Sequence, residues 1–580
     1  MKLSHRLLAA AAGLLLLAPT SHGHRVAIIG AGAAGSSTAY HLRQFADAAG
    51  VEVNITLFEK TDRIGGRTLT VNAFGDANQP VELGASIFVE VNKILCSAAD
   101  NFSLPRQPAG GDDDADDDDD ADSSSSSSSS SSSLLGIWDG DRFVYTQDER
   151  SSTWWSLVRL FWKYGAAPYR ANKLMQATIQ RFLELYEPPY FPFRSLTTRA
   201  YELELAYLTG QTGQQLLDAN KVSARFSHDI VQASTRVNYA SNLARIHGLD
   251  AMVALAPSGA SQIQGGNWQI FDHMARASGA AVRVNTSITH LDKVPGIEEG
   301  GSPSPSSSLS SSTRYVVKTK NALDVETTTE EEEEQEEFDS VVLASPFQFS
   351  GIEAGDGVLQ TAIDEIPYVR LHVTLFASPL KFDAAFFSLT PGSKNVPTTV
   401  LTTLADDDDA DDDDDDDDDD GSGKAGFFSI STLRRVINPS TLREEYLYKI
   451  FSPEAVTPAF LSKLFGVDVA DTLAEEAAAL PVISWYYPHV FHSYPRALPR
   501  VTFQDPVVGD SLYYTSGIES FISTMETSAL MGKNVARLIV DDILGLETGG
   551  PVVMEDGQED GKKAILAGTD DDQKTVVGEL

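Results

Sequence analysis

The strongest constraint on the fold is a glycine-rich segment that links an apolar strand to a helix. It reads RVAIIGAGAAGSSTAYHL over residues 25–42. Gly30 permits a tight turn, Gly32 lets the backbone approach a pyrophosphate, and Gly35 lets the helix pack closely on the sheet. The next predicted strand, VNITLFEK, ends near Glu59, whose carboxylate can accept hydrogen bonds from ribose hydroxyls. The segment predicts an α/β fold with a Rossmann-type βαβ unit that binds a dinucleotide.

Two segments that follow resemble the extended fingerprint of glutathione-reductase-type flavoproteins, especially their amine-oxidase-like branch. They read DRIGGRT over 62–68 and VELGAS over 81–86. The resemblance implies that their backbone, together with Arg67, lies close to a flavin. A third segment, LYYTSGIESFISTMETSALMGKNVARLI over 512–539, predicts a strand, a turn and a helix. Residues 519–525 are predicted to form the first part of this helix. A helix N-terminus there can stabilise negative charge on a reduced flavin.

These segments together identify the predicted dinucleotide as FAD. The chain has no second glycine fingerprint for NAD(P)H, so we expect molecular oxygen to be the electron acceptor. The residues predicted to bind FAD are Gly30, Gly32, Ala33, Ala34, Gly35, Glu59, Lys60, Gly65, Gly66, Arg67, Gly84, Ala85, Ser86, Gly517, Ile518 and Glu519.

Nearly the whole chain resembles the prenylcysteine oxidase (prenylcysteine lyase) family. The most specific stretches are LLGIWDGDRFVY (134–145), RVNYASN (236–242) and YLYKIFSPEAVTPAFLSKLF (446–465). The resemblance implies an FAD-dependent oxidase that uses O2 and water to cleave the thioether of farnesyl- or geranylgeranyl-cysteine. The implied products are cysteine, a prenyl aldehyde and H2O2. The flavin carries the hydride transfer, so no catalytic side chain and no metal site are predicted.

The residues that would bind the substrate are less clearly indicated. Aromatic side chains are available for an apolar pocket between 154 and 239, and Arg236 or a tyrosine of WYYPH (485–489) is a candidate for the substrate carboxylate. Two other functions stay open. One is an amine or polyamine oxidase of the same fold, and the other is a non-catalytic prenyl-binding carrier.

The N-terminus has the pattern of a secretory signal peptide over residues 1–23, with a basic start and an apolar middle too short to span a membrane. Three sequons, at Asn54, Asn101 and Asn285, fit that route. We therefore expect a vacuole- or lysosome-like compartment or the cell exterior. No later segment predicts a membrane span, although an apolar substrate could bring the protein to a membrane surface. The single cysteine, Cys96, excludes an intrachain disulfide.

The net charge of −39 is concentrated in three acidic runs. The runs at 112–122, 330–337 and 406–420 hold 30 acidic residues, and without them the charge would be −9. No basic stripe is present to bind phosphates, which argues against nucleic acid as a partner. Low-complexity sequence predicts disordered inserts at 106–133, at about 295–312, in the Glu run near 330 and at 405–424, with a flexible tail at 546–580.

Between these inserts the predicted elements indicate two interleaved domains. A Rossmann-type FAD-binding domain is expected from residues 24–105, 256–346 and 501–545. A substrate domain, rich in helices and containing a sheet, is expected from residues 134–255 and 347–500.

Overall fold

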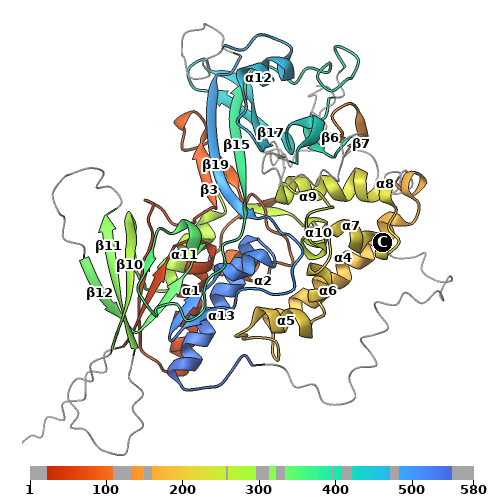
Figure 1. The fold of residues 1–580 in the computed structure, drawn as a ribbon. Coiled ribbons are helices and arrows are strands. Elements are labelled where there is room, and N and C mark those ends of the chain that lie inside the picture. The colour runs from red at the N-terminus through yellow and green to blue at the C-terminus, as the bar shows by residue number, and fades with distance from the viewer. Residues whose placement is uncertain are drawn as a thin grey trace, which may run out of the picture.

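The structure is a computed structural model (Figure 1). It describes residues 23–108, 134–148, 160–256, 259–295, 313–321, 334–393, 396–405, 421–470 and 482–550. The predicted signal peptide, except for Gly23, and most of the low-complexity sequence lie outside these residues.

The first elements form the predicted βαβ unit. Strand β1 (His24–Ile29) leads through the glycines into α1 (Ala33–Ala49), and β2 (Val53–Phe58) returns parallel to β1. The sheet is then completed by segments from far along the chain, in the order β20-β21-β13-β1-β2-β9. These added strands are β9 (Ala281–Arg283), β13 (Ser340–Leu343), β20 (Val507–Gly509) and β21 (Leu512–Tyr514). The pairings are parallel except for β20 with β21.

Two helices from opposite ends of the chain pack tightly beside this sheet. The last helix, α13 (Met525–Ile543), lies against α1, and the Ser37 hydroxyl donates to the Ala529 carbonyl (2.6 Å). A Cβ at Gly532 would lie 2.3 Å from the Ala34 carbonyl oxygen, so this close approach requires glycine. Helix α11 (Trp268–Ala277) also packs on α1. The predicted α/β fold is confirmed.

A second sheet of four strands adjoins the first, in the order β12-β11-β10-β14. Its strands are β10 (Thr286–Pro295), β11 (Thr313–Asn321), β12 (Glu334–Phe338) and β14 (Glu353–Ala354). The prediction of disorder for the Glu run was wrong for its last residues, which form β12. Cations on neighbouring strands explain this order: Arg25 and Arg283 pair with Glu336, and Arg314 pairs with Glu337.

A third sheet of seven strands forms the upper part of the molecule in Figure 1, in the order β19-β15-β18-β17-β16-β6-β7. Its strands are β6 (Leu134–Trp138), β7 (Phe143–Asp148), β15 (Tyr368–Ser378), β16 (Thr399–Thr402), β17 (Ser429–Asn438), β18 (Arg443–Ser452) and β19 (Trp485–Pro495). Helix α12 (Pro458–Phe465) shares a hydrophobic core with this sheet. The hairpin β3 (Leu69–Asn72)–β4 (Pro80–Gly84) shares a second core with it, which joins the sheet to the nucleotide-binding region.

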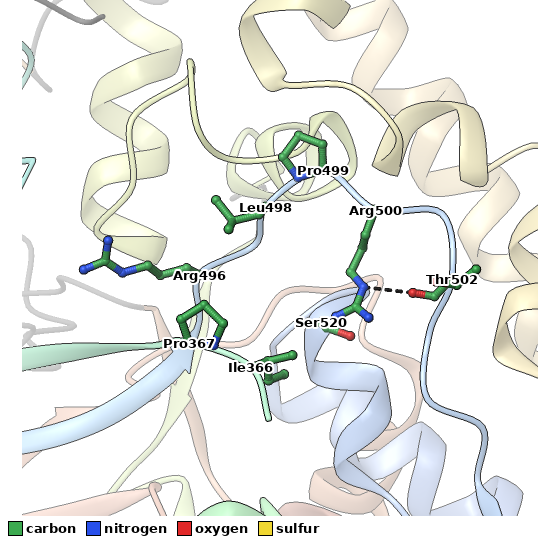
Figure 2. Close-up of a pocket in the computed structure, with 8 residues that line it drawn as sticks. All are labelled: Ile366, Pro367, Arg496, Leu498, Pro499, Arg500, Thr502 and Ser520. Carbon is green, nitrogen blue, oxygen red and sulfur yellow. Dashed lines mark hydrogen bonds between the residues drawn. The ribbon is translucent and has the colours of Figure 1, made fainter. Parts of the chain in front are cut away.

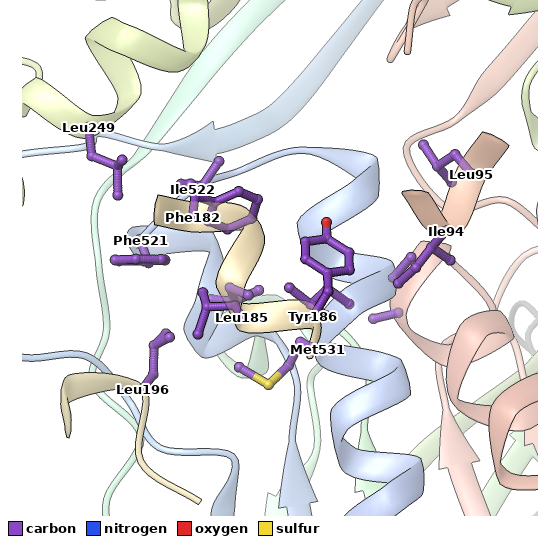
Figure 3. Close-up of a cluster of buried hydrophobic side chains, with 14 of the residues drawn as sticks. Ile94, Leu95, Phe182, Leu185, Tyr186, Leu196, Leu249, Phe521, Ile522 and Met531 are labelled. Atoms are coloured by element: carbon purple, nitrogen blue, oxygen red, sulfur yellow. The ribbon is translucent and has the colours of Figure 1, made fainter. Parts of the chain in front are cut away.

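A helical layer lies beside α13. It comprises α4 (Ala167–Leu183), α5 (Leu196–Glu202), α6 (Ala206–Thr209), α7 (Gly213–Ala219), α8 (Ala224–Phe226), α9 (Gln232–Tyr239) and α10 (Gly248–Ala254). Figure 3 shows part of the core that connects this layer to α13 and to α2 (Lys93–Asn101). The buried Glu526 of α13 accepts the backbone N–H groups of Ile94 and Leu95, and so caps the start of α2.

The predicted inserts are shorter than the sequence suggested. Residues 106–108 form strand β5 (Arg106–Pro108), which pairs with β8 (Ser261–Ile263), and Arg106 forms an ion pair with Asp100. At the other insert, the carbonyls of Gly421 and Ser422 accept hydrogen bonds from the buried Arg236. Tertiary contacts therefore order both edges. Among the residues that the structure describes, no helix is both long and apolar enough to cross a bilayer.

Candidate functional site

The first glycine loop has the geometry of a phosphate cradle. Gly30 has φ +106°, and a Cβ at Gly35 would lie 1.8 Å from the Gly30 carbonyl oxygen, so helix α1 can begin here only with glycine at both positions. A Cβ at Gly32 would meet nothing closer than the Cα of Gly66, at 3.7 Å. Ala33 and Ala34 form the first turn of α1, whose N–H groups favour an anion.

Glu59 lies at the end of β2, directly beside this loop. Its side chain is buried, and its two carboxylate oxygens accept hydrogen bonds from the backbone N–H groups of Ala31 and Thr61 (both 2.9 Å). These bonds fix the carboxylate next to the start of α1. Lys60, by contrast, is exposed and forms no hydrogen bond or ion pair within the described ranges.

The second glycine loop lies directly against the first. The Gly65 N–H donates to the Ala31 carbonyl (2.9 Å), and a Cβ at Gly66 would lie 3.0 Å from the Cα of Gly32. Both glycines have positive φ, +123° at Gly65 and +58° at Gly66. The guanidinium of Arg63 donates to the Gly66 carbonyl (2.7 Å) and holds the loop in this shape. Backbone thus meets backbone, with no side chain between the two loops.

Arg67 connects the N-terminal segment to the C-terminal one. Its guanidinium donates to the carboxylate of Glu519 (2.7 Å) and to the Ser493 carbonyl (2.7 Å). Glu519 is only 3% exposed, and its other oxygen accepts from the Tyr368 hydroxyl (3.1 Å). Burial raises the pKa of Tyr368, and the Glu519 carboxylate raises it further. The Arg67–Glu519 ion pair and its hydrogen bonds thus join four chain segments, which are the second glycine loop, residues 516–520, β15 and β19.

A partly buried cation, Lys449 of β18, lies beside the segment after β4 that is predicted to approach the flavin. Ala85 has φ +52°, and Ser86 Oγ accepts a hydrogen bond from Lys449 Nζ (2.9 Å). The same ammonium donates to the Glu82 carbonyl (3.1 Å). Burial lowers the pKa of Lys449 to about 8 and raises that of the Glu82 carboxyl to about 7. Gly84 faces the ring of Phe491 across β19.

The C-terminal segment differs from the prediction in where its helix begins. Residues Ser516–Ser520 form a short 3-10 helix, and α13 begins only at Met525. Thr524 caps α13 through a capping box with Thr527, which sets the start four residues beyond Phe521. Ile518 is fully buried, and a Cβ at Gly517 would lie 2.5 Å from the Gln504 carbonyl oxygen. Gly517 and Ile518 therefore act through packing, whereas Glu519 reaches the site.

Sequence reasoning missed several residues that the structure brings to this site. Tyr368 and Ser493 contact the Arg67–Glu519 pair, and Arg63 and Lys449 hold the two loops. Glu82 lies within the VELGAS segment but is not among the residues predicted to bind FAD, although its carboxylate accepts the backbone N–H of Asn267.

The hypothesis that Arg236 binds the substrate carboxylate was wrong. Its side chain is fully buried, and its guanidinium donates to Thr402 Oγ1, Asn242 Oδ1 and the carbonyls of Gly421 and Ser422. It joins α9 to the seven-stranded sheet, and its guanidinium is fully engaged by these protein oxygens. Among the candidate aromatic residues, Tyr164 and Tyr239 are buried in the core, whereas Trp154 lies outside the described residues.

Comparison with known proteins identifies the family. A family model described as prenylcysteine lyase matches residues 147–547. The chain belongs to the prenylcysteine lyase family. A second model, for an NAD(P)-binding Rossmann-like domain, matches residues 28–95. The matches confirm the resemblance predicted from the sequence and the nucleotide-binding character of the first βαβ unit.

Individual relatives of the prenylcysteine lyase family cover almost the whole chain. The sequence is 26% identical over 541 residues to farnesylcysteine lyase of Arabidopsis thaliana, covering 90% of this chain and 89% of that protein. It is 25% identical over 524 residues to prenylcysteine oxidase 1 of Homo sapiens, covering 89% of this chain and 88% of that protein. A triple mutant of putrescine oxidase has a similar fold, with a TM-score of 0.50 at 13% identity and coverage of 90% and 99%.

Proposed function

We propose that this protein is an FAD-dependent thioether oxidase that cleaves S-prenyl-L-cysteine. In the net reaction, farnesyl- or geranylgeranyl-cysteine, O2 and water give cysteine, the prenyl aldehyde and H2O2. The carbon–sulfur bond breaks, the first prenyl carbon is oxidised to the aldehyde, and O2 takes up the two electrons. The reaction would consume the lipidated cysteine that remains when prenylated proteins are degraded.

The observation that carries this proposal is the extent of the family match. It covers 147–547, which includes most of the seven-stranded sheet and all of the helical layer. The fold by itself does not choose a substrate, because putrescine oxidase has a similar one. The matched residues lie outside the first βαβ unit, which many flavoproteins share. The match therefore supports the prenylcysteine reaction more specifically than the nucleotide-binding motif does.

The residues of the cradle fit FAD. The Gly32 position leaves room for a pyrophosphate at the start of α1, and the Glu59 carboxylate beside it supports hydrogen bonds from the ribose hydroxyls. FAD, when bound, supplies a hydride acceptor and a route for two electrons to O2. Arg67 and Glu519 hold the loops on either side, and Lys449 keeps a cation beside Ser86. Sulfur and the allylic alkene both stabilise positive charge on the reacting carbon, so the proposal needs no strong base.

The test is an assay of the purified protein with farnesylcysteine. We expect a yellow protein with a flavin absorbance spectrum that releases farnesal, a free thiol and H2O2 in equal amounts. A flavin-loaded protein that forms none of these products would contradict the proposal. Peroxide formation from a polyamine, and not from farnesylcysteine, would support the amine oxidase alternative instead. A colourless protein that carries bound lipid would support the carrier.

We also propose that the protein follows the secretory route to a vacuole- or lysosome-like compartment or to the cell exterior. The signal pattern at residues 1–23 supports this proposal, as do the sequons. Asn101 is exposed at the end of α2, Asn54 is exposed within β2, and Asn285 is partly buried after β9. We expect Asn101 to carry a glycan. Treatment of the secreted protein with an endoglycosidase should shift its mass, and Asn101→Gln should remove part of that shift.

Peripheral contact with a membrane is a further part of the proposal. Phe161 and Trp162 are adjacent residues with 64% and 85% of their surface exposed. Large aromatic side chains of this kind favour the interface between lipid and water. Trp162→Ser should reduce the fraction of protein that sediments with phospholipid vesicles, and equal sedimentation of the two proteins would contradict the contact.

A further inference from the structure

A substrate of the proposed class brings an amino-acid carboxylate that the protein must bind. This requirement rests on the proposed function. Of the candidates predicted from the sequence, Arg236 is buried and already donates to four oxygen atoms, and the tyrosines of WYYPH lie on β19. Another cationic side chain can supply this contact, and Arg500 is a candidate.

A cavity of about 190 Å³ lies where the chain passes from β19 toward the last strands of the nucleotide-binding sheet. Figure 2 shows the residues that line it. Its apolar wall is formed by Ile366, Pro367, Leu498 and Pro499. Its polar groups include Arg500 and Ser520. The cavity holds about six water molecules' volume, which suits an amino-acid head group and not a fifteen-carbon chain.

Arg500 presents its guanidinium to this cavity. Its Nε donates to the Thr502 carbonyl (2.8 Å), and its backbone N–H donates to the Thr209 carbonyl (2.8 Å), so the residue is held at both ends. Nη2 forms a long ion pair with the exposed carboxylate of Asp364 (4.0 Å), and the guanidinium lies 5.7 Å from the centre of the Phe503 ring. In Figure 2 the guanidinium points toward Ser520, while that of the exposed Arg496 points away.

Two consecutive residues, Ser520 and Glu519, connect the cavity to the nucleotide site. Ser520 follows Glu519, whose carboxylate binds Arg67 at 2.7 Å. A head group held at Arg500 would therefore lie beside the segment that carries the Arg67–Glu519 pair. The arginine fork matches the two oxygens of a carboxylate.

We propose that this cavity binds the α-carboxylate of S-prenylcysteine through the guanidinium of Arg500 and leaves the prenyl chain outside. Arg500 is then a residue that determines specificity for the free amino acid over its ester. The apolar wall accommodates the carbon atoms of the head group.

The test compares farnesylcysteine with farnesylcysteine methyl ester in the flavin-loaded protein. We expect Arg500→Met to raise both the Kd from equilibrium dialysis and the KM for the acid by about 10- to 100-fold. The Kd of the ester should stay within about twofold, and kcat for the acid should change less than KM. Arg500→Lys should recover part of the loss, because it keeps the charge without the fork.

Arg435→Met is the matched control, since Arg435 lies on β17 and pairs with the exposed Glu444. This variant should leave the Kd of both the acid and the ester unchanged. Flavin absorbance and Tm establish that each variant is folded. Equal loss of acid and ester binding in Arg500→Met, or no loss of either, would overturn the inference. Failure of the wild type to convert either compound would refute the proposed function, and the dialysis result would still decide whether Arg500 binds the carboxylate.

Discussion

The six-stranded sheet and the seven-stranded sheet use their residues in opposite ways. Around the first sheet, the proposed cofactor site is built from backbone, because Gly32 faces Gly66 and the first N–H groups of α1 have no acceptor within the helix. Around the second, side chains decide what each region does, as the buried Arg236 and the cavity-lining Arg500 show. Both side chains are arginines, so residue type does not distinguish them. Only the surrounding tertiary structure separates the packing role of Arg236 from the binding role that we propose for Arg500.

This difference explains why the site beside the first sheet can be predicted from the sequence and the site beside the second cannot. A site made of backbone needs glycine wherever a Cβ would collide, and such positions are fixed in spacing. A site made of side chains needs only a suitable group somewhere on the correct face. Four variants sharpen or break this distinction.

The largest effect is expected from Gly35→Val. The new Cβ would lie 1.8 Å from the Gly30 carbonyl oxygen, and backbone cannot move aside as a side chain can. We expect a loss of about 4 kcal/mol or more in the free energy of unfolding, together with loss of flavin. Urea unfolding measures the first and absorbance the second. A stable, flavin-loaded variant would show that α1 does not depend on this close approach.

Arg236→Met tests the other region. Removal of the guanidinium leaves the oxygens of Thr402, Asn242, Gly421 and Ser422 without their donor in a buried place. We expect a loss of about 3 kcal/mol in stability. The flavin content of the folded fraction should stay at the wild-type level. A specific rise in the KM for farnesylcysteine, at unchanged stability, would instead restore Arg236 as a substrate ligand.

Gly32→Ala separates cofactor binding from folding within the first region. The residue has φ −79°, and the added Cβ would meet its nearest neighbour at 3.7 Å, so the apoprotein should lose no more than about 0.5 kcal/mol. The methyl group would block the approach of a pyrophosphate, and we expect FAD to bind roughly 10- to 100-fold more weakly. Fluorescence titration of the apoprotein with FAD gives the affinity. Unchanged affinity would mean that the phosphates lie elsewhere.

The smallest effect concerns the pH dependence of stability. Burial raises the pKa of Glu82 from 4.5 to about 7, so the folded protein holds this proton more tightly than the unfolded chain does. The free energy of unfolding should therefore fall as the pH rises from 4.5 to 7. The lowered pKa of Lys449 adds a cost that is relieved only above about pH 8.

Glu82→Gln should remove the decline in the free energy of unfolding between pH 4.5 and 7. Urea unfolding at several pH values measures this free energy. Glu444→Gln, a change in an exposed ion pair on β17, is the control and should leave the profile unaltered. Parallel profiles for wild type and Glu82→Gln would show that this carboxyl titrates normally in the folded protein.

The sequence predicted the βαβ unit, because its apolar runs and its glycine spacing are local signals. It could not predict that Arg67 meets Glu519, since these residues are distant in the chain and each fits several partners. It placed the start of the last helix too early, because the Thr524 capping box competes with the preceding turn. It also treated the Glu run as disordered, since the arginines that pair with β12 come from strands elsewhere in the sequence.

The assembly of the first sheet has a consequence for biosynthesis. Strand β1 pairs with β13, β13 pairs with β21, and α13 then closes over α1, so residues from both ends of the chain complete one cradle. A growing polypeptide of which only the first half has been synthesised lacks β21 and α13, which complete this sheet and cover α1. Acquisition of the yellow colour would then report that translation has reached the end of α13, and a chain released early would remain colourless.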